Sequence, residues 1–119
     1  MHIEFMIPAD GAQVSEGKLQ MIGGAWGNIN CRAFPASFVG ALAIGISLVR
    51  ADAGKEYHLT IDMCASDGTV KQRVGDAKFS IPPFIPKLRG RKDKLILLAA
   101  PLLLKIEQQE LLQFVAKID

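Results

Sequence analysis

The stretch FVGALAIGISLV, from Phe38 to Val49, decides the fold. Its even positions read Phe, Gly, Leu, Ile, Ile, Leu, and its odd positions read Val, Ala, Ala, Gly, Ser, Val. Because successive side chains of a β-strand point to opposite faces, one face of this segment is bulky and the other is small. The pattern predicts a central strand with its bulky face in the core and its small face covered closely by another layer or by a partner.

Segments with the same period of two flank this strand. We predict one strand from His2 to Ile7, ended by the turn residues Pro8 to Gly11, and a second short one from Gly17 to Gly23. The cleanest alternation runs from Tyr57 to Cys64. Ser66 to Thr69 then matches a tight hairpin turn, because Asp-Gly tolerates the positive φ that such turns require.

The second half of the chain continues the pattern. Apolar residues lie at even positions before Gly75 and at odd positions after it, which predicts a β-bulge or a break there. The prolines of Pro82 to Pro86 predict an extended connection. Leu95 to Ala100 predicts another strand.

The last residues fit two structures. One is a short helix. The other is a hairpin with Glu107 to Glu110 at its tip, followed by a last strand with one face formed by Leu112, Phe114, Ala116 and Ile118. Periodicity alone does not separate the two.

About seven to eight short strands predict an all-β fold, a single antiparallel β-sandwich domain spanning residues 1–119. The chain carries 14 Lys and Arg against 12 Asp and Glu, and half of its 119 residues are hydrophobic while 22% are charged. These values exclude a disordered chain, a collagen and a coiled coil.

The sequence predicts a cytoplasmic protein with no membrane segment. Its first fifteen residues carry Glu4 and Asp10 and lack an apolar run of signal-peptide length. The apolar stretches within residues 36–49 and 95–104 are too short to span a bilayer. Without a secretory signal, Cys31 and Cys64 are expected to be free thiols rather than a disulfide.

The segment from Gly23 to Asn28 is too rich in glycine for a regular strand. It lacks both the Lys-Ser/Thr of a phosphate loop and the glycine spacing of a dinucleotide site. Turn or bulge glycines beside a tryptophan at the edge of the core are the favoured interpretation. As the alternative, Trp26 stacks on a small ligand within a site made by Trp26, Gly23, Gly24 and Asn28.

The sequence predicts no catalytic residues, no metal and no cofactor. His58, Thr60, Asp62 and Cys64 share one face of their strand, but alternate residues lie almost 7 Å apart on an extended chain. His58 and Asp62 are therefore too far apart to bind one zinc ion without a sharp bend. A plain sheet face is favoured, and the protein is not expected to be an enzyme.

A basic segment, KLRGRKDK, contains Lys87, Arg89, Arg91, Lys92 and Lys94. It could engage phosphate or an acidic partner. However, it lacks the interleaved aromatic residues of single-strand binders. A solvated loop is favoured over a nucleic-acid site.

Several short motifs occur in a fixed order: Ala9-Asp10-Gly11-Ala12-Gln13-Val14, Gly17-Lys18-Leu19, Gly23-Gly24-Ala25-Trp26, Phe34-Pro35, the long apolar strand, and Asp67-Gly68. Over residues 4 to 81 this order resembles a group of small bacterial proteins known as a domain of unknown function. The resemblance implies an immunoglobulin-like or similar β-sandwich that ends in a strand, which favours the hairpin for the tail. It implies no activity.

The leading functional hypothesis is a non-catalytic structural or protein-interaction module. Large apolar residues fill both alternations of Leu95 to Leu98 and recur at Leu102 to Leu104, yet a second sheet covers only one face. A homodimer is the simplest cover, with another protein as the other partner, and Leu103→Glu is expected to loosen it. Small-ligand binding around Trp26 is second and nucleic-acid binding third.

Overall fold

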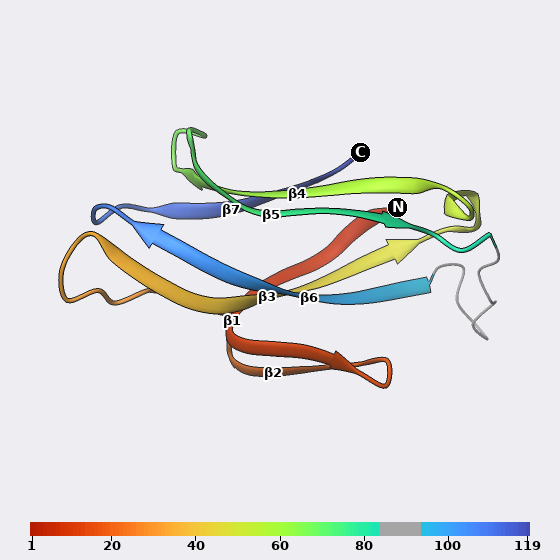
Figure 1. Ribbon diagram of the computed structural model, residues 1–119, viewed down its shortest axis with the longest axis horizontal. Helices are drawn as coiled ribbons and strands as arrows, with labels where there is room; N and C mark the ends of the chain where they lie inside the picture. The colour runs from red at the N-terminus through yellow and green to blue at the C-terminus, as the bar shows by residue number, and fades with distance from the viewer. Residues whose placement is uncertain (84–93) are drawn as a thin grey trace.

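The computed structural model describes residues 1–83 and 94–119, which form two antiparallel sheets packed face to face (Figure 1). One sheet has the order β2-β1-β3-β6 and the other β5-β4-β7. The elements are β1 (His2–Ser15), β2 (Lys18–Gly24), β3 (Ala36–Leu48), the 3-10 turn η1 (Arg50–Asp52), β4 (Glu56–Ala65), β5 (Val70–Ser80), β6 (Lys94–Ile106) and β7 (Leu112–Ile118). The predicted antiparallel β-sandwich is confirmed.

The strand order matches part of an immunoglobulin domain. In chain order, β1, β3, β4, β5, β6 and β7 take the places of strands A, B, C, C′, E and F. Within residues 1–83 and 94–119, no strand occupies the place of strand G beside β7. Among these described residues, the outer edge of β7 is therefore a free sheet edge.

Strand β3 is central, as its sequence predicted. It pairs along its whole length with β6 and also with β1. Its bulky face forms the core with the inner faces of β4 and β6. The core residues exposed by 7% or less include Leu42, Ile44, Ile46, Leu48, Leu59, Ile61, Met63, Leu102, Leu104 and Ile106.

The small face of β3 is covered by the same chain. Residues of β1 beyond Ala9 pair with β2, and this two-stranded arm lies below the sheet on the side away from β4, β5 and β7 (Figure 1). Cα atoms of β2 come within 8 Å of β6, and the Phe5 ring occupies the space beside Gly45. Ala43 on this face is consequently fully buried within the single chain, with no second protein needed to cover it.

The prediction that Pro8 to Gly11 end the first strand was wrong. The Pro8 carbonyl points away from β3 and accepts a hydrogen bond at 2.8 Å from the N–H of Ala25, the residue that follows β2. Proline therefore removes no hydrogen bond to β3, and β1 runs on while exchanging one partner strand for the other.

The hairpin of β4 and β5 follows its prediction. The chain turns at Ser66 to Thr69, where Gly68 has a φ of +91°. Ile61 is paired with Gly75 and Asp62 with Arg73, so Val74 is the extra residue of a bulge. The phase change predicted at Gly75 is thus a β-bulge inside one strand.

Both structures considered for the tail were wrong in part. No helix forms there, and β7 does not pair with β6 but crosses to the other sheet and pairs with β4. The predicted face is correct, because Leu112, Phe114, Ala116 and Ile118 pack against the core. The Gln72 amide takes the place beside β6 that a hairpin strand would occupy, donating to the Leu103 carbonyl (2.8 Å) and accepting from the Lys105 N–H (3.1 Å).

Candidate functional site

A groove of about 650 Å³ opens at one end of the sandwich, between the segment after β2 and the β6–β7 connection. Its apolar lining includes Trp26, Ile29, Phe34, Leu104, Leu112 and Phe114. Amide and carboxylate side chains, among them Asn28, Asn30 and Glu110, line the same space. Such an apolar groove with polar groups at its rim is suited to binding a peptide or a small apolar molecule.

Trp26 is fixed in the wall of this groove. Its indole N–H donates to Asp10 Oδ1 at 3.0 Å. Its ring meets Phe38 edge-on, with 5.0 Å between ring centroids, and fills the space where Gly40 has no side chain. The position of the ring is therefore set before anything binds.

The predicted ligand set divides into two pairs. Trp26 and Asn28 line the groove, whereas Gly23 and Gly24 do not. Gly23 has a φ of +59°, and a Cβ there would collide with the Asp10 carboxylate; at Gly24 it would meet the Met21 sulfur at 2.7 Å. Gly23 thus leaves room for Asp10, the acceptor of the Trp26 hydrogen bond, and Gly24 leaves room for the Met21 side chain.

The free edge of β7 borders the groove. His58 and Asp119 exchange two main-chain hydrogen bonds of 2.9 and 3.0 Å. Because such pairs alternate along antiparallel strands, the odd residues of β7 bond to β4 and the even ones point their main-chain groups away from it. The residues with outward groups are Leu112, Phe114, Ala116 and Ile118.

The core is incompletely covered at this edge. The same four even residues face the core but are only half-buried, whereas Leu59, Ile61 and Met63 of the neighbouring β4 are at most 4% exposed. One further strand beside β7 would cover these side chains and bind the outward main-chain groups together.

Of the other sheet edges, those of β5 and β6 are protected against pairing. Pro101 leaves β6 without one main-chain N–H, and Gln72 occupies the edge groups of β6 at Leu103 and Lys105. β5 carries Lys71, Arg73 and Lys78 and is bulged twice. Charges, proline and bulges are the usual protection of edge strands. β7 has neither proline nor bulge between Leu112 and Ile118, and Lys117 is its one basic residue.

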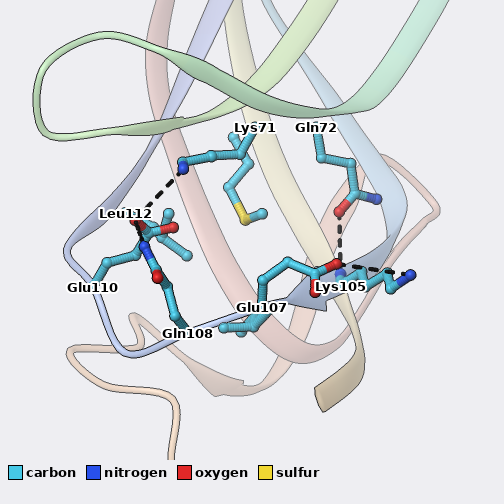
Figure 2. Close-up of a pocket in the computed structure, with 9 residues that line it drawn as sticks. Lys71, Gln72, Lys105, Glu107, Gln108, Glu110 and Leu112 are labelled. Carbon is cyan, nitrogen blue, oxygen red and sulfur yellow. Dashed lines mark hydrogen bonds and ion pairs between the residues drawn. The ribbon is translucent and has the colours of Figure 1, made fainter. Parts of the chain in front are cut away.

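A smaller pocket of about 250 Å³ lies across the β6–β7 connection from the groove. Figure 2 shows that polar side chains surround it: Lys71 lies 3.8 Å from Glu110, and Lys105 lies 3.7 Å from Glu107. Exposed pairs of this kind contribute little stability, typically below about 1 kcal/mol. The Lys71–Glu110 pair joins β5 to the β6–β7 connection, whereas the Lys105–Glu107 pair joins the end of β6 to that connection.

The outer face of β4 carries the residues considered for metal binding or catalysis. Arg73 donates to both Asp62 oxygens, at 2.9 and 3.3 Å, and holds the pKa of Asp62 below its usual value. His58 lies 2.5 Å from Asp76 and lowers the pKa of that carboxyl. These groups are paired with neighbouring strands. In the described parts of the chain, no three His, Cys, Asp or Glu side chains gather as a metal site.

Both cysteines are free, as predicted: Cys31 is half-buried at the groove and Cys64 is 4% exposed. A thiol reagent added to the native protein should therefore modify Cys31 well before Cys64. Mass spectrometry of peptides from a time course measures both rates. Equal rates would contradict the burial of Cys64, and urea should remove the difference in the same sample.

Four residues of the predicted basic patch, Lys87, Arg89, Arg91 and Lys92, lie outside the described residues. The fifth, Lys94, begins β6 and is half-buried opposite Leu48. Among the described residues, no helix has the length and hydropathy needed to cross a bilayer.

A family model described as a family of unknown function (DUF6941) matches residues 4–119. The match includes the tail, which lay outside the part of the chain with the clearest resemblance. No curated protein and no solved structure matches the chain.

Proposed function

This chain belongs to a family of unknown function (DUF6941), and we propose that it is a non-catalytic protein-interaction module. Its binding surface is the β7 edge, defined as the free side of Leu112–Ile118 together with the adjoining groove at Trp26. The ligand is an extended strand of polypeptide with apolar side chains at alternate positions. The free thiols Cys31 and Cys64 support a cytoplasmic setting for this role.

One observation carries the proposal: unpaired main-chain groups and half-covered apolar side chains belong to the same residues. An added strand gains main-chain hydrogen bonds from the first and apolar contacts from the second. Each hydrogen bond contributes roughly 0.5 to 1.5 kcal/mol net, and burial adds about 25 cal/mol per Å². The β5 and β6 edges do not offer this combination, and the side chains of the β2 edge strand are almost all exposed rather than half-covered.

The test is titration of the isotope-labelled protein with a panel of peptides of about ten residues, each with leucine or valine at alternate positions. We expect amide shifts at Phe114, Ala116 and Ile118, and slower hydrogen exchange at these amides. Charge-matched peptides with their apolar residues shuffled out of alternation are the control. Shifts on β5 or β6 instead, or none at about millimolar peptide, would refute the proposal.

A small-molecule ligand is the second candidate, favoured by the fixed Trp26 ring in the groove wall. Trp26 is the sole tryptophan, so its fluorescence reports on this groove alone. A compound that binds there should shift the Trp26 emission and raise the melting temperature in proportion to its concentration. It should leave the exchange of the β7 amides unchanged, which separates it from an added strand.

A further inference from the structure

From the register of β7 we infer that the strand bound at this edge is the β7 of a second copy of the chain. The inference rests on the proposed function and names its partner. The two β7 strands run antiparallel about a two-fold axis at Val115. The sheet then continues through both molecules in the order β5-β4-β7-β7-β4-β5.

The main-chain groups fit this register. An antiparallel pair exchanges hydrogen bonds only between residues whose groups face each other, which on β7 are the even ones. A two-fold axis at Val115 places Phe114 opposite Ala116 of the other copy, and Leu112 opposite Ile118. Every outward group from Leu112 to Ile118 then has a partner.

The side chains fit it as well. On the core face, the large Phe114 meets the small Ala116, and two aliphatic side chains meet at Leu112 and Ile118. On the outer face, Lys117 meets the neutral Gln113, while Val115, 36% exposed, meets itself. Moving the axis to Lys117 would place two lysines directly opposite each other, which is unfavourable.

This surface differs from the one that the sequence suggested. Leu103 and Val39 are cross-strand partners on the outer face of the larger sheet, exposed by 65% and 71%. Leu95 and Leu97 on that face are already half-buried, and Cα atoms of β2, which belongs to the chain's own arm, come within 8 Å of β6. The leucine-rich face of β6, which the sequence predicted to need a partner, therefore exposes mainly the pair Leu103 and Val39. The β7 edge instead offers both main-chain and apolar contacts.

Light scattering over a concentration series tests the inference. We expect twice the 12.9 kDa monomer mass at micromolar concentration, and a dimer about tenfold weaker in Val115→Lys, because two lysines then oppose each other. The matched control is Val70→Lys, which introduces the same charge on the β5 edge at a residue 56% exposed. Ala116→Pro should also abolish the dimer, since it removes an outward N–H without removing a bond to β4.

Each outcome decides the inference. Loss of the dimer in Val115→Lys and Ala116→Pro with a folded circular dichroism spectrum, and its persistence in Val70→Lys, supports it. A wild-type monomer up to about a millimolar overturns it. So does a dimer that withstands both β7 variants and dissociates in Leu103→Glu. A monomer that still binds the peptide panel would leave the proposed function standing with a different partner.

Discussion

Gly40→Ala should lower the free energy of unfolding by about 2 kcal/mol, although alanine is otherwise the better strand residue. Gly40 lies on the bulky face of β3, and a Cβ there would collide with the Trp26 ring and lie 2.6 Å from the Ala9 carbonyl oxygen. The Ala9 main chain is paired on one side with β2 and on the other with β3, so it resists displacement. The Trp26 ring must therefore move, and this movement breaks its hydrogen bond to Asp10.

Urea unfolding followed by Trp26 fluorescence measures both effects, because the native emission changes when the ring moves. Gly11→Ala is the matched control, since a Cβ at Gly11 meets nothing within 4 Å. That variant should be unchanged or slightly stabilised. Equal stability of the two variants would show that Trp26 is not wedged against Gly40.

The alternation of bulky and small residues in β3 was sufficient to predict its central place. The pattern also required a cover for the small face, but it could not identify that cover as the chain's own β1–β2 arm. Whether Pro8 ends a strand depends on the side to which its missing N–H points, and only the pairing partners decide this. The tail shows the same limit, because Leu112 to Ile118 would direct the same residues inward in either sheet.

In the candidate site too, some residues could be identified from the local sequence and others could not. Trp26 and Asn28 could be singled out from an irregular, glycine-rich segment, and both line the groove. Phe114 and Leu112 were recognised as core-facing but not as parts of a site, because a free edge is a property of sheet order rather than of local sequence. Gln72 carries no signal in the sequence for its role at β6.

A buried carboxylate at the opposite end of β3 stabilises the fold. Asp52, 5% exposed, accepts hydrogen bonds from the Val49 N–H (2.8 Å) and the Tyr57 hydroxyl (2.6 Å). It also lies 3.2 Å from the ammonium of Met1. Burial alone would raise the pKa of Asp52, but these donors outweigh it and hold the pKa below its usual value.

Asp52→Asn should therefore cost about 2 to 4 kcal/mol at neutral pH, because the amide leaves the Met1 ammonium without its counter-charge and replaces one buried acceptor oxygen with a donor. Since folding depresses the pKa of Asp52, its contribution is fully present above the pKa of the unfolded chain, near 4. It is lost as the pH falls through the lower pKa of the folded state.

Urea unfolding between about pH 7 and pH 2 should accordingly show the wild type losing stability on acidification while Asp52→Asn loses less, so that the two stability curves converge. Glu56→Gln, an exposed carboxylate next to Tyr57, is the control and should follow the wild type throughout. A constant gap between wild type and Asp52→Asn across this range would mean that the carboxylate charge is not what stabilises this end of the sandwich.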